Sequence, residues 1–274
     1  MVVSAAVLVV SAAAVAAAAE PDGIFKQTKQ VENMTKIPER PQDIFVPLTE
    51  DYRKVFGNDL VSLILYGSAA GSHYIRGKSD INLLVVLTEA GMDKLADVLD
   101  TVKAWEKRRV AIPLVMTRNF IECSLDSYPI EFMNMKNSHI LIYGEDVLEP
   151  LIFKPEDLRL QIERELRGKL ILLRQGYLEA EGKARQLKKL IANSFTAFIS
   201  IFKALLYLKH EKAPHGRRET IKEIGNLFAV DATVFMLCAD IKEGADHLSG
   251  AEVLDVFKKY LQAVNNLCNI VDCL

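Results

Sequence analysis

Short apolar runs bounded by glycine and polar residues characterise the first half of the chain. The runs Leu60–Tyr66 and Leu83–Leu87 have the length and the flanking residues that are typical of buried strands. A third run at 111–116 contains Pro113, which indicates a strand at the edge of a sheet. Around these runs the pattern predicts a helix at 47–56 before the first run and a helix at 89–109 after the second. It also predicts a further strand at 127–133 and a short helix or turn at 138–143. Strands that alternate with helices in this way predict an α/β (α+β) domain with a small mixed sheet.

From Pro155 onward the period of the apolar residues changes from that of strands to that of helices. Leu158, Ile162, Leu166, Leu170 and Leu173 recur at steps of three or four residues, which is one face of a long helix. Similar amphipathic patterns predict further helices at 183–209, 219–228, 234–242 and 251–271. No strand pattern intervenes, so we expect an all-α helical bundle. The predicted organisation is therefore a segment at 1–43, an α/β domain at 44–150 and a helical domain at 151–274.

The first residues are different again. Residues 1–19 carry no charge and consist almost wholly of Val, Ala and Ser, and a polar, proline-containing linker follows up to 43. Small residues before Glu20 are typical of a signal-peptide cleavage site, but the basic residues that should precede the apolar run are missing. Translation that begins at Met34 is the alternative. We expect a cytoplasmic protein, with export or membrane anchoring through residues 1–19 as the alternative.

The composition is that of an ordinary soluble protein. The chain has 274 residues, of which 50% are hydrophobic and 26% charged, and its formal net charge of −2 argues against a broad nucleic-acid surface. The four cysteines lack the paired spacing of zinc ligands, so we expect reduced structural thiols. The run Lys183, Arg185, Lys188 and Lys189 is expected to be a solvated helix face.

The turn between the first two strands carries the candidate chemistry. Gly67 allows a bulky anion to approach the backbone, and Ser68 offers an N–H group and a hydroxyl to it. Asp80, separated from Ser68 by eleven residues, opens the second strand, where its carboxylate could hold a divalent metal against phosphate oxygens. An ordinary Gly-Ser turn and a strand-end turn residue are the structural alternatives for these positions.

Gly67-Ser68, the loop, and Asp80-Ile81-Asn82-Leu83 resemble the nucleotidyltransferase superfamily, in particular its aminoglycoside-adenylyltransferase-like members. The family pattern has Gly-Ser at the end of a strand, a loop of similar length, and two acids separated by one apolar residue. The resemblance implies transfer of a nucleoside monophosphate, AMP from ATP, to a hydroxyl on an acceptor, with Mg²⁺ or Mn²⁺ as cofactor. A small-molecule acceptor is preferred over a nucleic acid. The sequence indicates neither the acceptor nor the oligomeric state.

The same resemblance assigns the remaining roles. Asp80 and Glu131 are the candidate catalytic carboxylates, and Asp80, Asn82 and Glu131 are the candidate metal ligands. Gly67, Ser68, Ser79, Arg76 and Lys78 are the candidate nucleotide-binding residues. For Arg76 and Lys78 a solvated loop charge is the simpler interpretation, and Glu131 alternatively is a strand residue that faces solvent.

Asn82 departs from the family pattern, because it replaces the second acid. An amide oxygen can bind Mg²⁺ but brings no charge. The loss of one unit charge at ~4 Å, at an effective dielectric constant of 20, removes about 4 kcal/mol of attraction. Expressed wholly in the transition state, this loss lowers the rate by roughly a thousandfold. Two hypotheses follow: weak catalysis with one metal, or a catalytically inactive nucleotide-binding or interaction module of the same fold.

Overall fold

The chain folds into two compact units. The computed structural model describes residues 37–71, 74–209, 214, 216–228 and 230–274, so the apolar segment 1–19 and Met34 lie outside the described residues. The first unit contains the described residues up to Ile121 together with Ser138–Pro150. The second contains Glu122–Asn137 and Leu151–Leu274.

The first unit is built on a four-stranded mixed sheet with the order β3-β2-β1-β4. The central strand β1 (Leu60–Tyr66) pairs antiparallel with β2 (Asn82–Leu87) and with β4 (His139–Gly144). The short strand β3 (Leu114–Thr117) pairs parallel with β2 at the edge of the sheet. The predicted fold class, a small mixed sheet with helices, is confirmed, and so is the edge position of the third apolar run.

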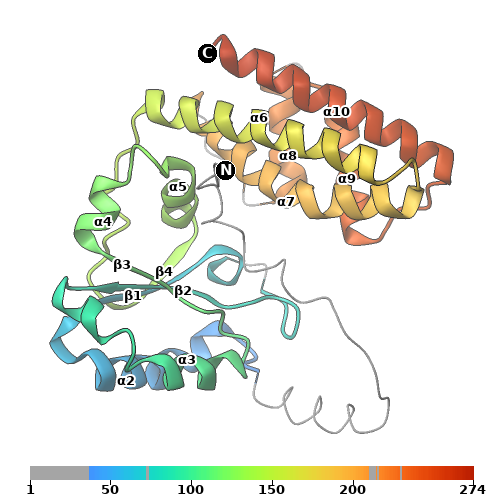
Figure 1. Cartoon of the computed structure of the whole chain (residues 1–274). Coiled ribbons are helices and arrows are strands. Elements are labelled where there is room, and N and C mark those ends of the chain that lie inside the picture. Colours follow the sequence, from blue (N-terminus) through green and yellow to red (C-terminus); the bar gives the residue numbers. More distant parts are fainter. Residues whose placement is uncertain (1–36, 72–73, 210–213, 215, 229) are drawn as a thin grey trace, which may run out of the picture. The chain divides into compact units, whose positions relative to one another are not determined.

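Helices α2 (Phe45–Phe56) and α3 (Leu99–Glu106) lie together on one face of this sheet (Figure 1). Tyr52 and Phe56 of α2 stack with ring centroids 6.3 Å apart, and both are buried in the same core as the strand residue Leu63. The helix expected over 89–109 is shorter than predicted. Its first part forms the 3-10 helix η4 (Ala90–Lys94), and regular α-helix is confined to α3.

Two predictions are wrong. The segment predicted as a strand at 127–133 is mostly helical, and the segment predicted as a helix or turn at 138–143 is a strand. Residues Pro129–Asn137 form helix α5, and His139–Gly144 form strand β4. Proline suits the first turn of a helix, since its fixed φ is helical and its missing N–H would have no partner there. The β4 sequence finds a partner only in the folded chain, where it pairs along β1. Glu131 is therefore a helical residue.

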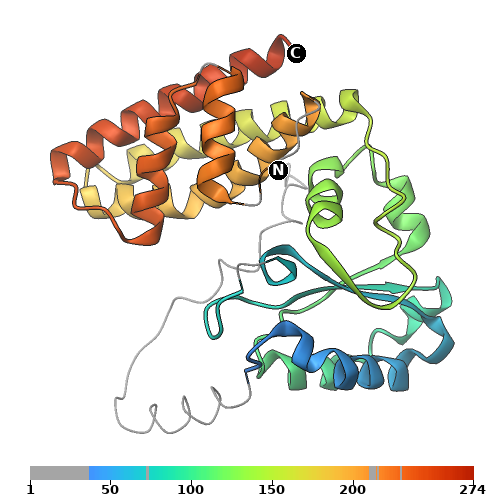
Figure 2. The same cartoon turned by 180° about the vertical axis from the view of Figure 1, so that it is seen from behind.

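The second unit is a helical bundle, as the periodicity predicts. Helix α7 is its central helix and packs against each of its neighbours; Figure 2 shows the bundle from behind. Phe198, Phe202 and Leu205 of α7 are fully buried. The long helices of the bundle are α6 (Pro155–Glu179), α7 (Ala184–Leu208) and α10 (Gly250–Asp272), and the shorter ones are α8 (Arg217–Phe228) and α9 (Ala232–Glu243). The remaining short helices among the described residues are η1 (Pro41–Ile44), η2 (Gly57–Asp59), η3 (Gly67–Ala70) and α4 (Arg118–Cys123).

Among the described residues, α7 is also the one helix long and apolar enough to cross a bilayer by length and composition. Its place at the centre of the bundle explains this composition, because a helix surrounded by other helices is apolar over most of its surface.

Candidate functional site

The turn after β1 is fixed by Ser138, the residue directly before strand β4. Gly67 has a φ of 78°, a left-handed conformation that favours glycine. Its N–H donates to the carbonyl of Ser138 at 2.9 Å, and the Ser138 hydroxyl donates to the Gly67 carbonyl at 3.0 Å. This pair of hydrogen bonds holds the start of η3 rigidly. The Gly67 N–H is therefore already used, whereas the Ser68 side chain at the next position is exposed.

Asp80 lies at the entrance to β2, and its carboxylate is paired with an arginine. The Arg109 guanidinium donates from Nη2 to Asp80 Oδ1 at 3.0 Å and to the Lys78 carbonyl at 3.2 Å. Both side chains are about one third exposed, at 38% for Arg109 and 37% for Asp80. The sequence interpretation missed Arg109. The sequence signal for it was its place in a basic run at the end of the helix predicted over 89–109, far from Asp80 in sequence.

Asn82 is brought next to the Gly-Ser turn by strand pairing. It lies opposite Tyr66 in the register of β1 and β2. A Cβ atom added to Gly67 would meet the Asn82 amide nitrogen at 3.5 Å. Asp80 and Asn82 are two residues apart along an extended segment, so their side chains point to the same side. The first unit thus gathers Gly67, Ser68, Asp80 and Asn82 around the end of β1.

The other loop residues predicted to bind nucleotide have partners of their own. Arg76 forms an ion pair with Glu39, and its Nε donates to the Ile37 carbonyl at 3.2 Å. Ser79 accepts from the Ile75 N–H at 3.0 Å and thereby closes the loop. Lys78 is exposed. Arg76 and Ser79 therefore stabilise the loop, and of the three Lys78 is the side chain best available to a ligand.

Glu131 belongs to the second unit, where a buried glutamine binds it. The Gln161 side chain on α6 donates from Nε2 to Glu131 Oε2 at 2.7 Å. Its other amide atom, Oε1, accepts from the Ile130 N–H at 2.8 Å. Gln161 is only 4% exposed. The first turn of α5 and the Glu131 carboxylate are thus held by one side chain, which the sequence analysis did not single out.

The donor groups in the first unit do not fit a resident Mg²⁺ as they stand. The Asp80 carboxylate is neutralised by the Arg109 guanidinium, and Asn82 brings a neutral amide where the family pattern has a second acid. Throughout the described part of the chain, no three side chains of His, Cys, Asp or Glu gather into a group that could hold a metal ion.

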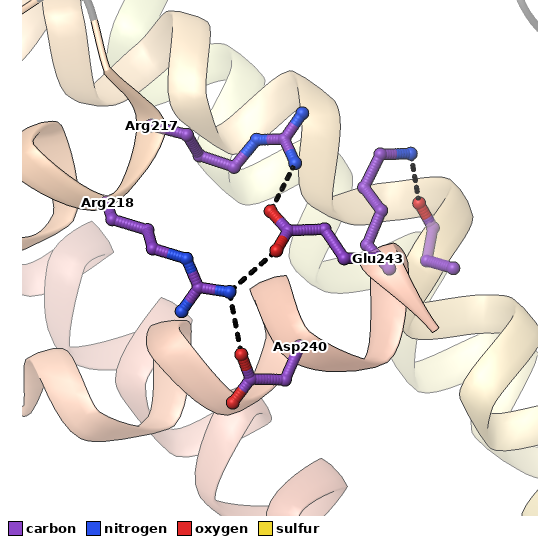
Figure 3. Close-up of polar contacts among 6 residues, drawn as sticks. Arg217, Arg218, Asp240 and Glu243 are labelled. Carbon is purple, nitrogen blue, oxygen red and sulfur yellow. Dashed lines mark hydrogen bonds and ion pairs between the residues drawn. The ribbon is translucent and has the colours of Figure 1, made fainter. Parts of the chain in front are cut away.

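Two arginines at the start of α8 are paired with acidic residues of α9. Arg218 donates to Asp240 at 2.7 Å and to Glu243 at 2.6 Å, and Arg217 donates to Glu243 at 3.1 Å (Figure 3). These bonds join α8 to α9. They pair both arginines of the segment 209–218, so these two side chains stabilise the contact between the two helices. Residues 210–213 and 215 of that segment lie outside the described residues.

Comparison with known proteins gives likenesses at the level of structure. No family model matches the chain, and neither does a curated protein sequence. Among solved structures, the chain is similar to a spectinomycin adenyltransferase, AAD(9) from Enterococcus faecialis, in a crystal structure with ATP and spectinomycin. The sequence identity is 13% and the TM-score is 0.46, over 88% of this chain and 99% of the other.

Proposed function

We propose that the first unit binds a nucleoside triphosphate, ATP in the first instance, at the turn that begins with Gly67. We further propose that the protein transfers the AMP moiety to a hydroxyl group of a small molecule. The observation that supports the proposal is the convergence around the end of β1. A glycine turn fixed by Ser138 carries the exposed Ser68 side chain, and Asp80 and Asn82 open the neighbouring strand.

The chemistry assigns simple roles to these groups. The Ser68 hydroxyl and the Lys78 ammonium would bind phosphate oxygens, which positions the α-phosphorus for attack. The acceptor oxygen then bonds to that phosphorus, the bond to the bridging oxygen breaks, and pyrophosphate leaves. The resemblance implies Glu131 as the base for the hydroxyl proton; it belongs to the second unit, where a hydrogen bond from Gln161 fixes its carboxylate.

The second candidate function is nucleotide binding without transfer. Two observations favour it: Asn82 in place of an acid, and the ion pair between Asp80 and Arg109. Both lower the negative charge available to Mg²⁺, which the resemblance implies as cofactor. In either case the ligand is a nucleotide, and a cytoplasmic location follows as a proposal because ATP is abundant there.

A transfer assay separates the two candidates. The protein is incubated with labelled ATP, Mg²⁺ or Mn²⁺, and a panel of small-molecule acceptors that includes spectinomycin. An Asn82→Asp variant is measured in parallel, and ATP binding is followed by calorimetry. Transfer by the wild type supports the enzyme. Binding without transfer, together with turnover by Asn82→Asp, supports the inactive module.

Ser68→Ala locates the site. We expect this variant to weaken ATP binding, whereas Ser127→Ala, which removes an exposed hydroxyl from the second unit, leaves it unchanged. If the wild type does not bind ATP with or without metal, both candidate functions are refuted.

A further inference from the structure

The backbone places Arg109 beside Asp80 in an unusual conformation. Arg109 has a φ of 63°, which is uncommon for a residue with a side chain. Two backbone hydrogen bonds fix it there. The Ile81 N–H donates to the Arg109 carbonyl at 2.9 Å, and the Ala111 N–H donates to the Ile81 carbonyl at 2.9 Å. The segment that precedes β3 is therefore joined to the segment that opens β2. The arginine is delivered to Asp80 by the framework of the sheet, and not by a flexible loop.

The guanidinium is used only in part. Its Nη2 bonds to Asp80 and to the Lys78 carbonyl, whereas its Nε is buried without a partner among the described residues. A strained backbone and an unpaired buried N–H both have an energetic cost, and such costs are typical of residues kept for function. The exposed part of the Arg109 guanidinium thus places a positive charge at the entrance to the candidate phosphate site.

The charged groups around Asp80 favour a guanidinium over a divalent cation. In the family pattern two acids attract divalent cations, but here one acid is the neutral Asn82 and the other, Asp80, is paired with Arg109. A divalent cation at Asp80 would have to approach a guanidinium that donates to the same carboxylate. Because like charges repel strongly at such distances, the cation can bind well only if Arg109 leaves.

We propose that Arg109 is the resident cation of this site. It occupies Asp80 in place of a divalent metal, and together with Lys78 it attracts the phosphates of a nucleotide without metal. The part that concerns metal exclusion stands on the ion pair alone. The part that concerns phosphates rests on the proposed nucleotide site.

Metal exclusion is tested without nucleotide. Free Mn²⁺ is measured by electron paramagnetic resonance while the protein is titrated. The wild type is expected to bind no Mn²⁺ that depends on Asp80. Arg109→Asn, which suits the left-handed backbone, is expected to gain a site at least tenfold tighter, and the double variant with Asp80→Asn is expected to lose it. Arg109→Gly replaces Arg109→Asn if the latter does not fold.

Arg108→Asn is the matched control, because it removes the same charge from the adjacent position, where the guanidinium lies over the Trp105 ring at 4.8 Å. It should bind no more Mn²⁺ than the wild type. The proposal is overturned if the wild type already binds Mn²⁺ through Asp80 as tightly as Arg109→Asn. It is equally overturned if Arg109→Asn gains no site, or if Arg108→Asn gains the same one.

The phosphate part is tested by ATP binding in excess chelator. When metal is removed, we expect the dissociation constant of the wild type for ATP to change less than twofold. Under the same change, the dissociation constant of Arg109→Asn for ATP should rise at least tenfold. Metal-dependent binding by the wild type overturns this part. If ATP does not bind under either condition, the proposed function fails, and the Mn²⁺ titration still decides the role of Arg109.

Discussion

Replacement of Gln161 by methionine is expected to destabilise the helical unit by releasing the first turn of α5. Methionine has nearly the same length and a good helix propensity, so the change on α6 is confined to the amide group. The wild-type amide accepts from the Ile130 N–H at 2.8 Å and donates to Glu131 at 2.7 Å. Both bonds are lost together.

The cost follows from burial. The Ile130 N–H belongs to the first turn of a helix, where it has no partner within the helix. Left buried and unpaired, such a group costs about 1–3 kcal/mol. The bond to Glu131 adds less, because that carboxylate is partly exposed and water can replace the amide. The burial of a methionine side chain offsets part of the loss, and a net destabilisation of about 1–3 kcal/mol remains. This corresponds to a fall in melting temperature of roughly 2–12 °C.

The assay is thermal unfolding monitored by circular dichroism, with Gln175→Met as the control. Gln175 lies on the same helix, is exposed and makes one hydrogen bond, to Glu179 at 3.0 Å. Its replacement should change stability by less than about 0.5 kcal/mol. Gln161→Glu keeps the acceptor for the Ile130 N–H but places a carboxylate against Glu131. The loss of stability in this variant should therefore diminish as the pH falls and the carboxylates are protonated. Equal melting temperatures for Gln161→Met and Gln175→Met would refute the reasoning.

Three further changes test other parts of the fold. Gly144→Ala should break the pairing of β1 with β4 and cost about 4 kcal/mol or more, because the new Cβ would lie 1.9 Å from the Val61 carbonyl oxygen. Faster cleavage of the variant in limited proteolysis would show this loss of pairing. Arg218→Met should cost about 1 kcal/mol in urea unfolding, and less in high salt, because its carboxylate partners are partly exposed. Asp59→Asn should destabilise the protein at neutral pH but not in acid, because hydrogen bonds from Lys94 and Thr88 lower the pKa of Asp59.

The sign of the pH effect is fixed by the direction of that shift. The stabilisation by Asp59 is present above the pKa of the unfolded carboxyl, about 3.9, and is lost as the pH falls through the lower pKa of the folded state. An equal gap between wild type and Asp59→Asn at neutral pH and at about pH 2 would contradict this reasoning. An Arg218→Met effect that salt does not change would show that packing, and not charge, dominates there. A normally folded Gly144→Ala protein would show that β4 tolerates a shift.

The local sequence determined the elements that can be stabilised by their own pattern. The apolar runs of β1 and β2 specify buried strands, and the regular stripe of α6 specifies a helix, because each pattern has one periodicity and a clear end. The Gly-Ser turn between the strands was visible for the same reason. The fold class, a small mixed sheet followed by helices, follows from these elements alone.

Only the tertiary structure decided the elements and contacts that depend on distant partners. The segment 139–144 is a strand because β1 offers it an edge, and 129–137 is a helix that Gln161 fixes at its first turn. Arg109 meets Asp80 because a backbone bridge joins segments that lie far apart in sequence. Hydrophobic periodicity contains no information on which charged groups will be neighbours, so the ion pair that dominates the candidate site could not be predicted from it.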